Sequence, residues 1–214
     1  MFGAVCADLL RNRPVDGLGS EIQAGRTSHL QLDAFFDSLK SLAPCRNLLF
    51  NIGSLKHYSG PVLDVCADYV IGKNWNLLFN GRIEDFVLRI HNALITNIRL
   101  LPEKARASVT ALVNENQLLA YRDQAGLGMA LDRLAIAVGK RNWNNIVEGK
   151  PKIMSLIPII EPFILAALPD IRAHMQRLVA PEYTQVARLV WREGITISRE
   201  HASVASVRHE KEPV

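Results

Sequence analysis

The chain has 214 residues, of which 49% are hydrophobic, and its 25 Lys+Arg against 21 Asp+Glu give a net charge of +4. High apolar content with modest net charge excludes a largely disordered chain, because disorder requires low hydrophobicity and high charge. Cys6, Cys45 and Cys66 are odd in number and include no CxxC pair, which argues against a disulfide scaffold and a thiolate zinc site. We therefore expect a reducing, cytoplasmic location.

The first predicted helix contains the segment SHLQLDAFFDS, residues 28–38. His29, Asp33 and Asp37 recur every four residues, so their side chains share one face of a helix. Imidazole nitrogen and carboxylate oxygen both coordinate manganese, iron or zinc. This segment alone nevertheless favours the simpler alternative, a solvated polar helix face.

A second helix is predicted from Pro61 to about Gly72, because proline suits the first turn of a helix, where its missing N–H has no partner. Asp64 and Asp68 lie one turn apart in this otherwise apolar segment. Carboxylates near a core are costly unless they cap a helix, pair with arginine or hold a metal. For Asp64 and Asp68, a structural ion pair and a functional site are equally compatible with the sequence. The same two alternatives apply to Asp8.

Helical periodicity continues through the middle of the chain, where apolar residues recur at spacings of three and four. Proline and glycine clusters separate these segments, and we expect breaks at Asn80-Gly81 and at Gly149-Lys150-Pro151. The expected buried faces are Val87, Ile90, Leu94, Ile98 and Leu101; Ala105, Val109, Leu112 and Val113; and Leu127, Leu131, Leu134 and Val138.

The longest apolar stretch, residues 153–171, contains two acidic residues and three prolines, whereas a membrane span needs roughly 20 mostly apolar residues. We interpret it as a core helix kinked by proline and expect no membrane association. Beyond Trp191 the sequence becomes polar and loses its helical period. The sequence thus predicts an all-α fold, with a single compact helical domain over residues 1–193 and a flexible polar tail over residues 194–214.

Several motifs, in order, resemble those of the bacterial acyl-carrier-protein phosphodiesterases, divergent relatives of the HD-type metal-dependent phosphohydrolases. Three segments carry the resemblance: GAVCADLLR at 3–11, residues 25–37 with His29, and residues 58–69 with both aspartates. Trp75 follows at the expected place, and Tyr121-Arg122-Asp123 resembles a later family motif. The resemblance spans roughly residues 3 to 180, and the ordered set is more specific than any single motif.

The resemblance implies hydrolysis of the phosphodiester that joins 4'-phosphopantetheine to a serine of acyl carrier protein, with Mn²⁺ as the favoured ion. It also implies a role for each matching residue: Asp8, His29, Asp33 and Asp68 as metal ligands, Asp64 as the group that orients a ligand or manages a proton, and Arg122, Arg11 and Arg26 as substrate-binding residues.

An acidic carrier protein would give the positive net charge a partner, because complementary charge speeds encounter. Arg11, Arg13 and Arg26 lie near the predicted site in sequence. A second basic cluster, which is as readily explained as ordinary solvated side chains, consists of Lys140, Arg141, Lys150 and Lys152.

The sequence departs from the family pattern at three places. Leu30 replaces an arginine, Tyr69 replaces a histidine, and we expect the family's usual first segment, which supplies another histidine, to be absent. A non-catalytic helical protein that still binds a carrier protein is therefore an alternative. A second alternative is an HD-type nucleotide phosphohydrolase. Nucleic-acid binding rests on the basic balance alone, with no binding motif, and we do not expect it.

Overall fold

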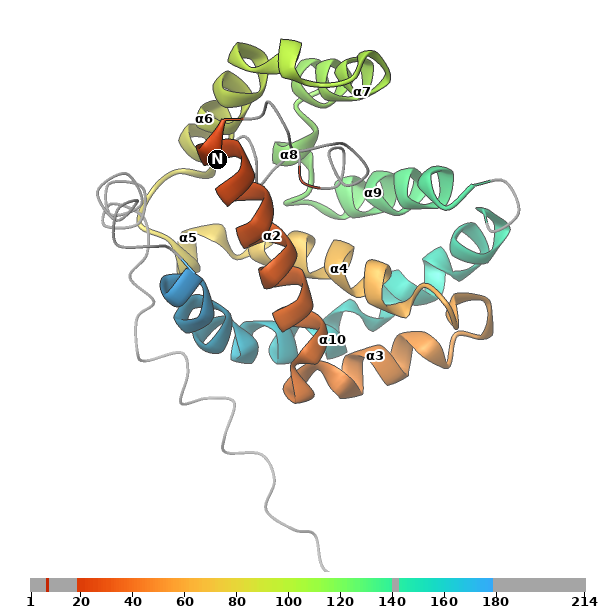
Figure 1. The fold of residues 1–214 in the computed structure, drawn as a ribbon. Helices are drawn as coiled ribbons and strands as arrows, with labels where there is room; N and C mark the ends of the chain where they lie inside the picture. Colours follow the sequence, from red (N-terminus) through yellow and green to blue (C-terminus); the bar gives the residue numbers. More distant parts are fainter. Residues whose placement is uncertain (1–6, 8–18, 140–142, 179–214) are drawn as a thin grey trace, which may run out of the picture.

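A long curved helix, α10 (Trp143–Leu178), is the spine of the molecule (Figure 1). In this computed structural model, residues 7, 19–139 and 143–178 are described, and they form helices with no strand, as the sequence predicts. The remaining α-helices are α2 (Ser20–Ser38), α3 (Ala43–Phe50), α4 (Ser59–Lys73), α5 (Trp75–Leu78), α6 (Ile83–Thr96), α7 (Glu103–Asn114), α8 (Gln117–Ala120) and α9 (Gln124–Ala137). Short 3-10 helices lie at Lys40–Leu42, Gly53–Leu55 and Ile98–Leu100. The predicted tail lies outside the described residues.

One face of α10 is buried along its length and packs against α9, α4, α2 and α3. Spacings of three and four residues place the buried side chains on that face, as an amphipathic core helix requires. They join residues of α3, α4 and α9 in the main hydrophobic core. The buried residues of α10 in this core are Ile146, Ile153, Ile157, Ile160, Ile164 and Ala167.

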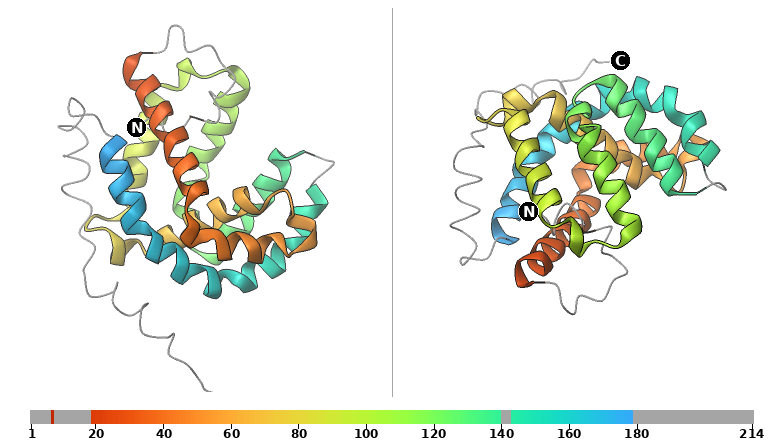
Figure 2. Two further views of the ribbon diagram at one scale, coloured as in Figure 1. Left: turned by 60° about the horizontal axis from the view of Figure 1, so that its bottom comes forward. Right: turned by 90° about the horizontal axis from the view of Figure 1, so that it is seen from above.

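The four prolines inside α10, Pro151, Pro158, Pro162 and Pro169, are all exposed. A proline inside a helix removes one backbone hydrogen bond and bends the helix away from its ring. Prolines on the solvent side therefore curve α10 around the core, a curvature that Figure 2 shows in its left view. The predicted core helix with proline kinks is present.

The predicted break at Gly149-Lys150-Pro151 is wrong, because these residues lie inside α10. A Cβ at Gly149 would lie 3.2 Å from Leu55 Cγ, so the absence of a side chain lets the helix approach the 3-10 helix that contains Leu55. Ile146 and Ile153, on either side of the glycine, are fully buried. Burial on both sides outweighs the local preference of glycine and proline for a turn.

Helices α6 and α7 build a second, smaller core around Ile90, Leu94 and Val109. The predicted face of 87–101 is interrupted, because α6 ends at Thr96 and a 3-10 helix follows at Ile98–Leu100. Asn97 ends the helix by donating its side-chain Nδ2 to the carbonyl of Ala93 at 2.9 Å. Leu101 is nevertheless buried in the same cluster, so the hydrophobic prediction is confirmed although the helix is shorter.

Helix α2 bridges the two cores. Ile22 near its start packs against the smaller core, and Phe36 near its end packs against the main core. Figure 1 shows α2 crossing the molecule from the α6 end to the α3 end. None of its residues is fully buried, so α2 lies on the surface of the bundle and leaves its polar face accessible.

Part of α10, Asn144–Leu178, is long and apolar enough to cross a membrane by length and composition. A core helix of a soluble protein meets the same criterion. Within the described residues its apolar stripe is packed against α9, α4 and α2.

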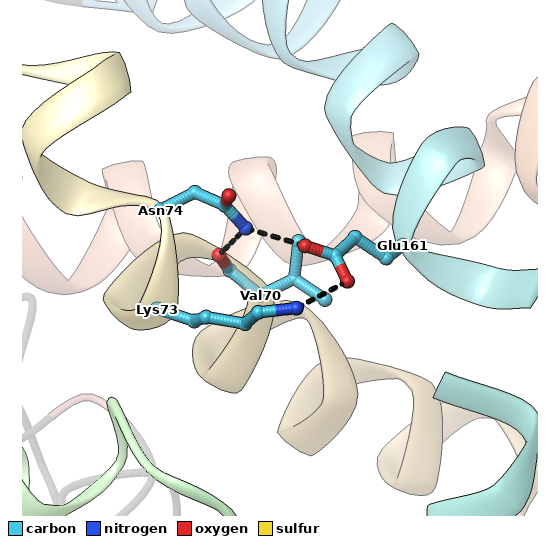
Figure 3. Close-up of polar contacts among 4 residues, drawn as sticks. All are labelled: Val70, Lys73, Asn74 and Glu161. Carbon is cyan, nitrogen blue, oxygen red and sulfur yellow. Dashed lines mark hydrogen bonds and ion pairs between the residues drawn. The ribbon is translucent and has the colours of Figure 1, made fainter. Parts of the chain in front are cut away.

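A polar contact attaches the end of α4 to the middle of α10 (Figure 3). Glu161 accepts hydrogen bonds from Lys73 Nζ at 2.7 Å and from Asn74 Nδ2 at 2.8 Å. The same Asn74 nitrogen also donates to the carbonyl of Val70 at 2.9 Å, which accepts the backbone N–H of Asn74 at 3.1 Å as well. The glutamate side chain is only 17% exposed, so it is a well-shielded partner for both groups.

We predict that Glu161→Ala destabilises the fold by about 1 to 3 kcal/mol, because two hydrogen bonds to an ionised carboxylate are lost. These hydrogen bonds lower the pKa of Glu161 against the opposing effect of burial, which raises it. A lowered pKa stabilises the fold at neutral pH, and this contribution is lost as the pH falls through the folded pKa. Urea unfolding of the wild type and Glu161→Ala at several pH values measures the difference in their free energies of unfolding. An equal difference at neutral and at strongly acidic pH would contradict the prediction.

We also predict that Gly126→Ala is strongly destabilising. A Cβ at Gly126 would lie 1.7 Å from the carbonyl oxygen of Ala120, which belongs to the backbone and cannot simply rotate away. The expected loss is about 1 to 3 kcal/mol or more. Gly53→Ala is the matched control, because a Cβ there meets nothing within 4 Å. Thermal unfolding compares the two variants, and similar melting temperatures would refute the predicted clash.

Candidate active site

The polar face of α2 carries the first group of candidate residues. His29 Nε2 lies 3.1 Å from Asp33 Oδ2, one turn further along the helix. Asp37, one turn beyond, approaches α4: a Cβ at Gly60 would lie 3.9 Å from Asp37 Oδ1. A carboxylate near the first turn of a helix is favoured by the helix dipole. The predicted shared face of His29, Asp33 and Asp37 is therefore directed toward α4 at its far end.

Side chains on other faces of α2 hold it in place. Phe35 stacks on His174 of α10, with ring centroids 3.9 Å apart and an interplanar angle of 2°. Arg46 of α3 donates hydrogen bonds to the carbonyls of Phe36 and Leu39, where α2 ends. A cation at the C-terminus of a helix satisfies carbonyls that have no helical partner. These contacts fix the direction in which the acidic face points.

Helix α4 supplies the second group. Val62, Leu63 and Cys66 are buried in the main core, whereas Asp64 and Asp68 lie on the accessible side of the helix. The two aspartates thus share a face, as predicted, and the sequence-based concern that they enter the core is removed. The burial of the opposite side of α4 determines that this acidic face points away from the core.

Asp68 has an unusual electrostatic environment. Its pKa is raised to about 6, mainly because the surrounding protein desolvates the carboxylate. His29 acts in the opposite direction and lowers this pKa, whereas the negative charge of Asp33 raises it further. Asp68 is exposed as a whole residue, and the desolvation comes from the protein that surrounds its carboxylate at the pocket that it lines. The structure therefore brings His29, Asp33 and Asp68 into one electrostatic group.

Asp68 lines a pocket of about 260 Å³ between α4 and α9. Tyr121 and Arg133 are its other polar side chains, and small or apolar residues form the rest of the wall. Those residues are Val65, Ala130, Leu134 and Ala137. A mainly apolar pocket with few polar groups is typical of a site for a small molecule or an extended chemical group.

Arg133 is not among the site residues predicted from the sequence, although the spacing of its neighbours indicates its position. Ala130, Arg133, Leu134 and Ala137 follow spacings of three, one and three, which place them on one face of the predicted helix. A charged residue on a face that also carries leucine and alanine indicates a partly buried cation. Periodicity alone could not predict that Arg133 and Asp68 line the same pocket.

The motif Tyr121-Arg122-Asp123 combines three separate contacts. Tyr121 lines the pocket, and Asp123 caps α9 by accepting a hydrogen bond from the backbone N–H of Gly126 at 2.7 Å. Arg122 pairs with Glu84 of α6 at 2.9 Å and is 47% exposed. Substrate binding by Arg122 stays a prediction, and the ion pair corresponds to the structural alternative for an arginine at this position.

The other predicted residues divide between described and undescribed parts of the chain. Arg26 is half-buried on α2, one turn before His29. Asp8, Arg11, Lys140 and Arg141 lie outside the described residues. In the second basic cluster, Lys150 forms an ion pair with Asp132 at 2.8 Å. That lysine is thus already partly neutralised, which weakens the case for a free basic patch there.

The substitution at position 69 affects the core more than the acidic face. Tyr69 is only 9% exposed and belongs to the main hydrophobic core. Since neighbouring residues on a helix point about 100° apart, Tyr69 is directed away from the face of Asp68. Leu30 is partly buried on α2. In this fold, a side chain at position 69 contributes to packing.

Imidazole and carboxylate oxygens suit a divalent ion, and a desolvated carboxylate beside a second negative charge is relieved by a cation. By donor chemistry His29, Asp33 and Asp68 therefore fit a metal. Within residues 19–139 and 143–178, however, no group of three or more His, Cys, Asp and Glu side chains is arranged to hold a metal ion. Asp8, the fourth predicted ligand, is not among the described residues.

The fold and this group of residues define an all-helical protein with an acidic face beside a mainly apolar pocket. A family model described as acyl carrier protein phosphodiesterase matches residues 1–155. The chain belongs to this family. No curated protein and no solved structure matches the chain. The matched region includes α2, α4, α9 and the whole pocket.

We predict that Asp68→Asn stabilises the metal-free protein at neutral and alkaline pH. The folded pKa of about 6 lies above the ordinary value of 3.8, so folding favours the protonated form. The stability linked to that proton is complete below about pH 4 and is lost as the pH rises through the folded pKa. Asparagine cannot ionise, so the variant escapes the loss.

Thermal unfolding in the presence of a chelator, from about pH 4 to pH 8, measures this difference. The melting temperature of Asp68→Asn should exceed that of the wild type by an amount that increases with pH. Asp85→Asn, an exposed aspartate on α6, is the control for removing one negative charge. An Asp68→Asn variant that is less stable than the wild type at every pH would contradict the prediction.

Proposed function

We propose that the chain hydrolyses the phosphodiester between 4'-phosphopantetheine and the serine of holo-acyl carrier protein, giving the apo carrier and free phosphopantetheine. The family match over residues 1–155 carries this proposal. The electrostatic coupling of His29, Asp33 and Asp68 beside a pocket supports it. We further propose that Mn²⁺ is the cofactor and that the enzyme acts in the cytoplasm.

His29, Asp33 and Asp68 are the described residues that would hold the ion, together with Asp8. A bound divalent ion would lower the pKa of a water molecule and neutralise charge on the phosphoryl oxygens. The 3.1 Å contact between His29 Nε2 and Asp33 Oδ2 keeps these two side chains together on α2. Asp64, one turn before Asp68 on the accessible side of α4, is positioned to orient a ligand or to manage the proton of the leaving serine.

The positive net charge of the chain supports an acidic carrier protein as its partner. Acyl carrier proteins are acidic, and this chain carries a net charge of +4. Opposite net charges speed the encounter of two proteins, an effect that falls as salt rises. Arg26 lies on the same helix as His29 and Asp33, one turn before His29, so it adds a positive charge to that part of α2.

We predict that the purified chain converts holo- to apo-acyl carrier protein with Mn²⁺, and that Asp33→Asn and Asp68→Asn lower the rate at least about a hundredfold, more than the loss of an outer partner usually costs. Mass spectrometry of the carrier protein measures the loss of its phosphopantetheine. Asp85→Asn is the control, because Asp85 is exposed on α6 and outside the pocket. Full activity in both site variants would refute the assigned site.

A non-catalytic carrier-binding protein is the second candidate. It is favoured by the finding that, among the described residues, no three His, Cys, Asp or Glu side chains are arranged to hold a metal ion. Carrier binding without Mn²⁺ binding and without release of phosphopantetheine would establish this alternative. Hydrolysis of nucleotides but not of holo-carrier protein, in a substrate panel, would instead identify an HD-type nucleotide phosphohydrolase.

A further inference from the structure

Two opposite charges share the pocket between α4 and α9. Asp68 and Arg133 both line it, yet they form no ion pair with each other in the described part of the chain. Opposite charges near a core normally pair, because a direct contact offsets the cost of desolvation. Charges that remain apart across a pocket can instead each bind a ligand group of opposite sign.

Arg133 has a weak structural partner. Its Nη2 lies 3.3 Å from Glu115 Oε2, a long contact with a side chain that is 60% exposed. The same oxygen also accepts a shorter hydrogen bond, of 2.7 Å, from Gln117 Nε2. An exposed pair of this kind contributes little stability. A ligand can therefore take Arg133 from Glu115 at small cost.

The second nitrogen of the guanidinium is without a partner. Nη1 of Arg133 is buried and has no hydrogen-bond acceptor among the described residues. A buried donor that lacks an acceptor is costly, more so when it is charged. The planar guanidinium suits a phosphate, which can accept two parallel hydrogen bonds from it. This donor becomes available to an anion in the pocket when Arg133 leaves Glu115 and turns toward the ligand.

The remaining wall suits an uncharged chain. Val65 and Leu134 provide apolar surface, and Ala130 and Ala137 keep the pocket open because their side chains are short. The pocket thus offers a cation for a phosphate and an apolar surface for the group attached to it. Arg122 is less suited to this role, since it pairs with Glu84 outside the pocket lining.

We infer that Arg133 binds the phosphate of the phosphopantetheine group, with the pantetheine arm lying along Val65, Ala130, Leu134 and Ala137. The inference rests on the proposed function and adds a substrate-binding residue to it. It assigns the anion to Arg133, on the side of the pocket that α9 forms, and leaves Asp68 on the α4 side.

Binding of free 4'-phosphopantetheine and of pantetheine, which lacks the phosphate, tests the inference on the full chain by calorimetry. Arg133→Met should weaken phosphopantetheine binding by about ten- to a hundredfold, the range expected for lost hydrogen bonds to a charged group. Pantetheine binding should be unchanged. Arg133→Lys keeps the positive charge but not the planar guanidinium, so its affinity for phosphopantetheine should lie between those of the wild type and Arg133→Met.

Two further variants control the experiment. Arg89→Met removes an exposed arginine of α6 that is not part of the pocket and should leave both affinities unchanged. Ala137 is exposed and lines the pocket, so Ala137→Phe should fill the pocket and weaken the binding of phosphopantetheine and of pantetheine to the same extent. Unchanged phosphopantetheine binding in Arg133→Met, with the variant shown to be folded by circular dichroism, would overturn the inference.

The outcome is separable from that of the proposed function. Suppose that the wild type hydrolyses holo-carrier protein and that Arg133→Met has the same kcat/KM and the same affinity for phosphopantetheine as the wild type. The proposed enzyme activity would then be supported, and a phosphate-binding role for Arg133 would be excluded. If the wild type shows no hydrolysis but binds phosphopantetheine through Arg133, the pocket is retained and the activity is excluded. Failure of the wild type to bind either ligand would overturn the inference as well.

Discussion

Burial of one face of α10 is the constraint on which the other elements depend. Its isoleucines enter a core shared with α3, α4 and α9, and residues at its far end contact α2. A straight helix of this length would touch a globular core over only part of its surface, whereas the exposed prolines bend α10 around it. Residues that disfavour a helix locally are therefore used here to increase burial, and the hydrophobic gain outweighs the lost hydrogen bonds.

The acidic face follows from this arrangement. Because α4 must bury Val62, Leu63 and Cys66 against α10 and α9, its aspartates have to face outward. Helix α2 is held at both ends, by Ile22 in one core and Phe36 against the other, so its polar face is left accessible along the middle. Two acidic faces are thus placed near each other by packing on their opposite sides.

Periodicity predicted most of the fold because the buried faces of α4, α6, α7 and α9 are regular. The break predicted from glycine and proline was wrong at Gly149, where contact with Leu55 outweighs local turn propensity. Periodicity overextended α6, which Asn97 ends. The site was less accessible to sequence reasoning. His29 and Asp33 are one turn apart, so their spacing in the sequence predicts that their side chains lie together. Asp68 and Arg133 belong to different helices, and only tertiary packing brings them to one pocket.

The pairing pattern of charged residues separates structural from functional roles better than exposure does. Lys73 with Glu161 and Lys150 with Asp132 form direct contacts of 2.7 and 2.8 Å between helices. Asp68 shows the opposite pattern, because the surrounding protein desolvates its carboxylate and raises its pKa, and among the described residues no cation is in direct contact with it. The fold thus pairs other charges across its helices, whereas Asp68 and one nitrogen of Arg133 line the same pocket without a direct partner among the described residues, and this contrast underlies the phosphate-binding role that we infer for Arg133. A metal-associated phosphate would bring both a positive and a negative part to this pocket, whereas a neutral ligand would leave both charges without a partner.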